Sequence, residues 1–204
     1  MPVTRERFEQ GMSYEEYKAQ MTRNRARFEE NEQTVTLPAE DLHFFKQLPE
    51  TLHVLVLAED WCGDVIANLP VLGRLAAESG KLNLRVFLRD QNLDLMDQYL
   101  KDGAHRSIPT FVFFSEDFRE LGHWIERPAL VNERQGRMLD DLFATDPTLQ
   151  GLSRATSPAQ LPEEARTRLM QALGAFRGEI RQTADQEVVR EIRELITRGL
   201  AANA

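Results

Sequence analysis

The middle of the chain alternates between short apolar runs and segments with helical spacing. Residues 52–58 form an apolar run of strand length that is rich in β-branched residues, as expected for a central strand buried on both faces. From Gly63 to about Ser79, apolar residues recur every three or four positions. This spacing predicts a helix that ends at Gly80.

Three further apolar runs have the character of strands. They cover residues 84–89, 110–114 and 120–125, and a short helix is predicted over 92–101. The last two runs are separated by five residues, which predicts a β-hairpin. Parallel neighbours need crossover helices, whereas hairpin strands are antiparallel, so this order predicts a mixed sheet with helices on both faces.

Both ends of the chain are predicted to be helical. A capping box at Ser13 and Glu16 opens the first helix, and a second box at Thr183 and Gln186 opens a separate last helix. The apolar stripe of this last helix either docks on the core or is buried in a second copy of the chain. The other predicted helix bounds are 14–27 for the first helix, then about 38–48, about 128–144 and 163–176.

The composition is that of an ordinary globular protein, with 42% hydrophobic and 28% charged residues. The net charge of −8 argues against nucleic acid or a membrane surface as a partner, because both need a basic face. No apolar run reaches the roughly 20 residues of a membrane span. Residues 1–20 are charged throughout and lack the apolar segment of a signal peptide. We therefore expect a soluble, cytoplasmic protein.

The chain contains one cysteine, Cys62, so it cannot form an intramolecular disulfide, which fits a reducing cytoplasm. The four histidines show no ligand pair at helical or hairpin spacing, so no metal site is expected. Glycine-rich phosphate and dinucleotide loops are also missing from the sequence. We expect no cofactor.

Cys62 stands between the end of the predicted central strand and the first turn of the next helix. Unpaired backbone N–H groups and the helix dipole stabilise a thiolate at such a position. The carboxylates of Glu59, Asp60 and Asp64 act in the opposite direction. Each effect is under about 1 kcal/mol after screening, so the sign of the pKa shift stays open. Arg106 either approaches the thiol and offsets these acids or is a solvated loop charge.

A second local signal is Pro109, which directly precedes the strand predicted over 110–114. A proline at this place is a candidate for a cis peptide bond. Pro70 falls in the middle of the predicted helix after Cys62, where its ring removes a hydrogen bond and predicts a kink.

Four short motifs occur in an order that is informative as a set: Trp61-Cys62-Gly63, Pro70 eight residues after the cysteine, Asp90-Gln91-Asn92, and Ile108-Pro109-Thr110. With them, the chain resembles the thioredoxin superfamily over about residues 51–142, and more narrowly a bacterial thioredoxin-like group. The resemblance implies an α/β thioredoxin-like fold, in which a mixed central sheet is flanked by helices. The expected domains are an N-terminal helical extension over 1–50, the thioredoxin-like domain over 51–146 and a C-terminal helical extension over 147–204.

The sequence differs from the family pattern at residues that take part in the family's redox chemistry. Val65 stands at the position of the resolving cysteine, Asp64 at that of the intervening proline, and Val56 at that of the buried aspartate. The dithiol cycle therefore cannot run within one chain. What remains is a monothiol function, in which a Cys62 thiolate attacks a disulfide, or is oxidised by a peroxide, and an external low-molecular-weight thiol resolves the product.

The resemblance implies a set of site residues. Cys62 is the expected nucleophile, and Asp64 is either its general acid or base or simply a favourable residue of an early helix turn. The alternative function is a non-catalytic module that binds a protein or peptide in a groove on the same scaffold. The expected partner is a protein or a low-molecular-weight thiol or disulfide, with a homodimer as a further option. The residues expected to border the substrate are Trp61, Gly63, Ile108 and Pro109.

Overall fold

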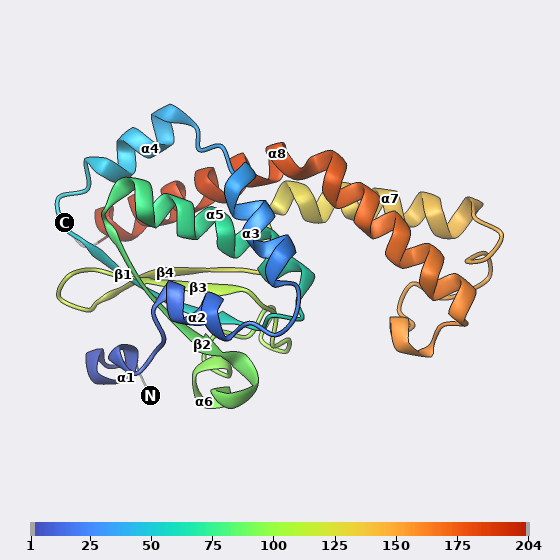
Figure 1. Cartoon of the computed structure of the whole chain (residues 1–204), viewed down its shortest axis with the longest axis horizontal. Coiled ribbons are helices and arrows are strands. Elements are labelled where there is room, and N and C mark those ends of the chain that lie inside the picture. The colour runs from blue at the N-terminus through green and yellow to red at the C-terminus, as the bar shows by residue number, and fades with distance from the viewer. Residues whose placement is uncertain (1–2, 203–204) are drawn as a thin grey trace. The chain divides into compact units, whose positions relative to one another are not determined.

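The computed structural model describes residues 3–202, which divide into two compact units (Figure 1). Within the described residues, the first unit comprises 3–127 and 185–202, and the second comprises Pro128–Ala184. The three consecutive domains expected from the sequence have other boundaries than these two units. That domain division stays a prediction. All residues with expected roles at the site belong to the first unit.

The first unit is built on a mixed four-stranded sheet with the order β2-β1-β3-β4. Strand β1 pairs in parallel with β2 and antiparallel with β3, and β3 and β4 form the antiparallel hairpin. Every residue of β1 except His53 is buried, as its continuous apolar run predicts. The strands are β1 (Leu52–Ala58), β2 (Leu82–Leu88), β3 (Thr110–Phe114) and β4 (Glu120–Ile125).

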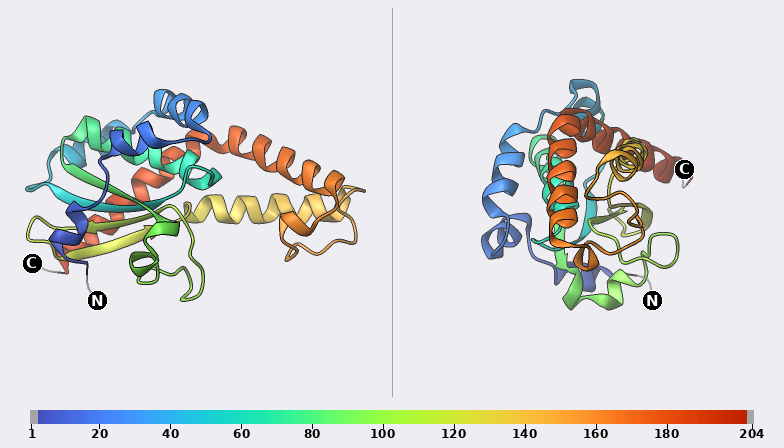
Figure 2. Two further views of the ribbon diagram at one scale, coloured as in Figure 1. Left: turned by 60° about the horizontal axis from the view of Figure 1, so that its bottom comes forward. Right: turned by 90° about the vertical axis from the view of Figure 1, so that its right-hand side faces the viewer.

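Helix α5 (Gly63–Ser79) follows β1 and lies on one side of the sheet, while α1 (Arg5–Glu9) and α6 (Leu93–Met96) lie on the other (Figures 1 and 2). Gly80 ends α5 in the left-handed conformation, with φ of 65°, and its N–H donates to the Ala76 carbonyl at 3.0 Å. The predicted bounds of α5 and the fold class are thus confirmed.

The N-terminal segment contains α2 (Tyr14–Gln20), α3 (Arg25–Thr34) and α4 (Ala39–Lys46). Both hydrogen bonds of the predicted capping box between Ser13 and Glu16 are present. A single helix over 14–27 is wrong, because the chain leaves the helix at Met21 and Asn24 takes a left-handed φ of 55°. The N–H groups of the intervening residues 22 and 23 donate to the Asp60 carboxylate instead, so a tertiary contact interrupts the helix.

Two further bounds differ from the prediction. Strand β2 covers Leu82–Leu88 rather than 84–89, since its pairing with β1 begins at Leu82. The helix predicted over 92–101 is reduced to the four residues of α6 after a 3-10 turn at Arg89–Gln91. Its second half forms turns closed by an isolated bridge between Lys101 and His105.

The C-terminal part contains α7 (Ala129–Thr145), a 3-10 turn at Pro158–Gln160 and α8 (Glu163–Ala201). The two helices predicted after residue 163 are one helix, and the capping box at Thr183 is wrong, because Thr183 lies in the helix interior. Interior N–H groups are already bonded to the preceding turn and need no cap. In the second unit the core consists of Leu142, Leu149, Leu161, Ala165 and Leu169. Further along α8, four residues are fully buried in the core of the first unit: Val188, Val189, Ile192 and Ile196.

Replacement of Ser13 with alanine is expected to lower the free energy of unfolding by about 1 kcal/mol, because it removes half of the capping box. Urea denaturation followed by circular dichroism measures this change. The matched control is Thr183→Ala, which should change the free energy by less than about 0.5 kcal/mol, since alanine is at least as good inside a helix. An equal loss in both variants would contradict the continuity of α8.

Candidate functional site

Cys62 is the N-cap residue of α5 and is half-buried. Its N–H donates to the Glu59 carbonyl at 3.2 Å, and its carbonyl accepts from the Ile66 N–H at 3.0 Å. The sulfur is therefore carried by the residue at which β1 turns into α5. The dipole of a 17-residue helix begins at this residue and favours negative charge there.

The sulfur of Cys62 faces the loop before β3. Its thiol donates to the Ile108 carbonyl oxygen, with Sγ and O 3.5 Å apart, and the Ile108–Pro109 peptide bond is cis. The sheet explains why residues 46 positions apart meet: Leu57 pairs with Thr110, so the end of β1 and the start of β3 lie at the same edge. The geometry thus places the Cys62 sulfur beside Ile108 and the cis bond to Pro109, and the roles of these residues stay a prediction.

Asp64, in the first turn of α5, forms an ion pair with Arg127, whose Nη2 lies 2.6 Å from Oδ2. Both side chains are only 15% exposed. Arg127 also contacts the Glu126 carboxylate at 2.7 Å, and Lys101 pairs with the same carboxylate. Because the guanidinium compensates the charge of Asp64, this carboxylate opposes a thiolate at Cys62 less than the sequence suggests.

Sequence reasoning missed Arg127, which is the second residue after the end of β4. It lies 63 positions from Asp64, and no motif or helical spacing links the two residues. Only the pairing of Ile125 with Thr110 reveals that the end of β4 reaches the same edge of the sheet as Cys62. The role of Asp64 as a general acid or base stays a prediction.

Trp61 is exposed, with 42% of its surface accessible. The guanidinium of Arg89 lies over its ring at 4.9 Å, a cation–π contact. Arg89 also donates to the Arg106 carbonyl at 3.1 Å and to Asp90 at 2.7 Å. Arg89, which sequence reasoning also missed, therefore connects the ends of β1 and β2 to the loop that leads to Pro109.

Arg106 forms a bidentate ion pair with Asp97, with N–O distances of 2.7 and 2.9 Å. Both side chains are about half exposed, at 47% and 48%. The hydrogen bonds from Arg106 lower the pKa of Asp97. Of the two alternatives for Arg106, the structure favours the solvated loop charge.

The acids before Cys62 are held by different partners. Glu59 is buried, with 8% of its surface exposed, and accepts the Asp90 N–H at 2.8 Å. Burial raises the pKa of Glu59 and outweighs this hydrogen bond. Asp60 accepts the N–H groups of Thr22 and Arg23 at 2.7 and 2.9 Å.

The two positions that correspond to the family's resolving cysteine and buried aspartate both lie in the core. Val65 and Val56 are fully buried. Since Cys62 is the single cysteine of the sequence, no second thiol is present to resolve a mixed disulfide on it. The reactive group available at this site is therefore a single thiol beside the loop that contains Pro109.

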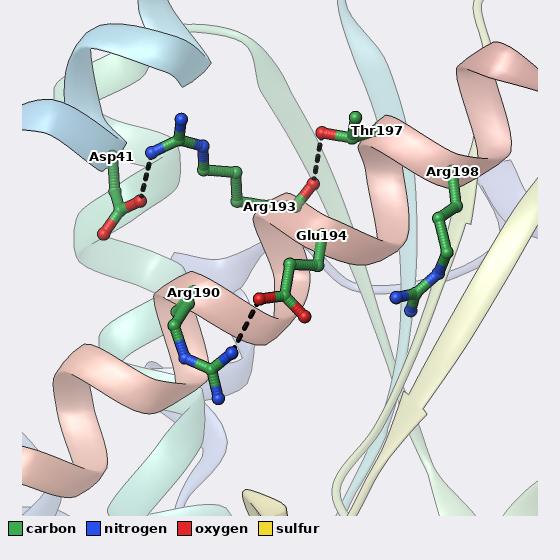
Figure 3. Close-up of a pocket in the computed structure, with 6 residues that line it drawn as sticks. All are labelled: Asp41, Arg190, Arg193, Glu194, Thr197 and Arg198. Atoms are coloured by element: carbon green, nitrogen blue, oxygen red, sulfur yellow. Dashed lines mark hydrogen bonds and ion pairs between the residues drawn. The ribbon is translucent and has the colours of Figure 1, made fainter.

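A separate hollow of about 450 Å³ lies between α4 and the last turns of α8 (Figure 3). Two of the three arginines that line it are paired: Arg193 contacts Asp41 at 2.9 Å, and Arg190 contacts Glu194 at 2.6 Å. Asp41 and Glu194 thus offset part of the positive charge of the hollow. It contains none of the residues expected at the site.

A family model described as Thioredoxin matches residues 11–139. This match covers more than half of the chain, so the chain belongs to the thioredoxin family, and the predicted superfamily is confirmed. No curated protein is significantly similar to it.

Solved structures show the same fold. An HIV epitope-scaffold is 15% identical, with a TM-score of 0.63 over 93% of this chain and 94% of the scaffold. A protein of unknown function from Pseudomonas aeruginosa is 19% identical, with a TM-score of 0.61 over 88% of this chain and 99% of that protein. At these identities the likeness concerns the fold alone. None of the helices in the described part of the chain has the length and hydropathy required to span a bilayer.

Proposed function

We propose that this protein is a monothiol member of the thioredoxin family that performs thiol–disulfide exchange through Cys62. The observation that carries the proposal is the position of the sulfur, at the N-cap of α5 and 3.5 Å from the carbonyl oxygen of Ile108. An N-terminal helix end stabilises a thiolate, and the thiolate is the nucleophile in exchange.

In the proposed reaction, the Cys62 thiolate attacks one sulfur of a disulfide. A bond forms between the two sulfurs, the original disulfide bond breaks, and the other half leaves as a thiolate that takes a proton from water. The thiolate of a low-molecular-weight thiol then attacks the substrate sulfur of the mixed disulfide, forms a new disulfide with it and releases Cys62 as a thiolate. Cys62 returns to the thiolate with which the cycle began, so one cysteine is sufficient.

The proposed substrate contacts surround the sulfur. The carbonyl oxygen of Ile108 lies 3.5 Å from it, Pro109 follows Ile108, and Trp61 and Gly63 flank Cys62 in sequence. The exposed face of Trp61 supplies an apolar surface for the disulfide-bearing partner. We infer a cytoplasmic location from the single cysteine, since reducing compartments keep such thiols available.

A non-catalytic binding module is the second candidate function. The observation that favours it is the exposure of Trp61, at 42%, because exposed aromatic residues are enriched at protein interfaces. In this alternative, Cys62 is a half-buried residue without a reactive role, and the surface around Trp61 and Pro109 binds a partner segment. A homodimer stays a prediction in both cases.

The rate of Cys62 alkylation as a function of pH distinguishes the two functions. Exchange predicts a thiol pKa below the free value of about 8.5 and a glutathione adduct after incubation with glutathione disulfide, detected by intact-protein mass. The adduct should be lost in Cys62→Ser. A thiol pKa at or above about 8.5 with no adduct would favour the binding module.

A further inference from the structure

Glu126, the first residue after β4, has a backbone conformation that is unusual for its residue type. Its φ of 71° lies in the left-handed region, which glycine adopts readily and which is disfavoured for a residue with a Cβ atom. Such conformations persist where the surrounding contacts hold them, and they are frequent at functional sites. The contacts that hold Glu126 are therefore informative about the site beside it.

The backbone of Glu126 is hydrogen-bonded to both segments that meet at Cys62. Its N–H donates to the Pro109 carbonyl at 2.7 Å. Its carbonyl accepts from the side-chain amide of Asn68 at 3.0 Å, and the same amide donates to the Asp64 carbonyl at 3.0 Å. Asn68 lies within α5 and is buried. The backbone of Glu126 thus connects the loop before β3 to the first two turns of the helix that Cys62 caps.

The carboxylate of Glu126 makes a second connection between the same two segments. One oxygen lies 2.7 Å from the Arg127 guanidinium, which pairs with Asp64 in the first turn of α5 at 2.6 Å. The other oxygen pairs with Lys101, in the turns between α6 and β3, where Lys101 and His105 exchange two backbone hydrogen bonds of 2.8 and 2.9 Å. The Glu126 side chain is only 20% exposed, so these contacts are screened less than surface ion pairs.

We propose that Glu126 is a positioning residue for the exchange reaction, whose carboxylate holds the loop of Ile108 and Pro109 at a fixed separation from the Cys62 sulfur. This inference rests on the proposed exchange function and adds to it a residue from outside the thioredoxin-like motifs. The attacking sulfur and the two sulfurs of the substrate disulfide must align, so the exchange rate depends on the loop against which the substrate lies. This role accounts for a charged side chain at a position whose φ favours glycine.

The variant Glu126→Gly tests the inference in the full-length protein, because glycine accepts this φ and removes only the carboxylate connection. The rate constant for adduct formation with glutathione disulfide, measured by intact-protein mass and corrected for the thiolate fraction, should fall about tenfold. The rate constant for iodoacetamide alkylation of the thiolate should stay unchanged, because this small reagent needs no contact with the loop. The pKa of the Cys62 thiol should not rise, since the loss of a negative charge does not disfavour a thiolate.

Glu126→Gln is a second variant, which keeps the length of the side chain. Its single amide oxygen accepts from Arg127 or from Lys101 and does not compensate both charges, so its exchange rate should lie between those of the unaltered protein and Glu126→Gly. Asp102→Gly is the matched control. Asp102 also has a positive φ, of 52°, but its side chain is exposed. This variant relieves the same kind of backbone strain and should leave both rate constants unchanged.

An unchanged exchange rate constant in Glu126→Gly, while the unaltered protein forms its glutathione adduct, would overturn the role of Glu126 alone. An equal fall in Asp102→Gly would also overturn it, because the effect would then belong to the backbone of the loop. A parallel fall in iodoacetamide alkylation would do the same, since it would reflect the reactivity of the sulfur. An unaltered protein that forms no adduct would overturn the exchange function itself and this inference with it.

Discussion

Replacement of Val65 with cysteine is expected to give the protein a dithiol reductase activity that it otherwise lacks. Position 65 lies three residues after Cys62 on the first turn of α5, and its side chain is fully buried. The N-cap and third helical positions lie within reach of each other, as side chains of capping boxes show. The new thiolate would attack Cys62 in a mixed disulfide, close the intramolecular disulfide and release the substrate as a thiol.

Insulin reduction with dithiothreitol as the reductant measures this gain. We expect Val65→Cys to exceed the unaltered protein at least about tenfold, because an intramolecular thiol acts at a high effective concentration. The matched control is Val65→Ser, which has a similar size and no thiol and should stay at background. Vigorous turnover by the unaltered protein, or equal rates for the cysteine and serine variants, would contradict the monothiol interpretation.

Replacement of Arg127 with glutamine is expected to lower the free energy of unfolding by about 3 kcal/mol. The change leaves Asp64 and Glu126 without the guanidinium that contacts both, and the Asp64 side chain is only 15% exposed. The uncompensated charge of Asp64 should also raise the pKa of the Cys62 thiol. Urea denaturation and the pH dependence of alkylation measure the two effects.

Arg106→Gln is the control for a general loss of an arginine. Its ion pair with Asp97 is about half exposed, so it should contribute less than about 1 kcal/mol. Adding Asp64→Asn to Arg127→Gln should recover part of the loss, since it removes the unpaired charge. If the Arg127 and Arg106 variants were equally stable, the pair with Asp64 would have no special role.

The sequence by itself determined the central elements of the fold. The apolar run of β1, the helical spacing of α5 up to Gly80 and the hairpin of β3 and β4 were predicted with their observed bounds. These features are local, because apolar periodicity and a terminating glycine act within one element. The motifs around Cys62 and Pro109 were also visible, and their order agrees with the family that the comparison found.

The surroundings of the thiol were decided only by the tertiary structure. Arg127 meets Asp64, Arg89 meets Trp61, and the Asp60 carboxylate interrupts the N-terminal helix. The physical reason is that a side chain binds whatever the sheet register and the packing bring near it, across 28 to 63 positions in these cases. Contacts across such sequence separations produce no periodic pattern in a single sequence, whereas helix and strand patterns repeat every few residues.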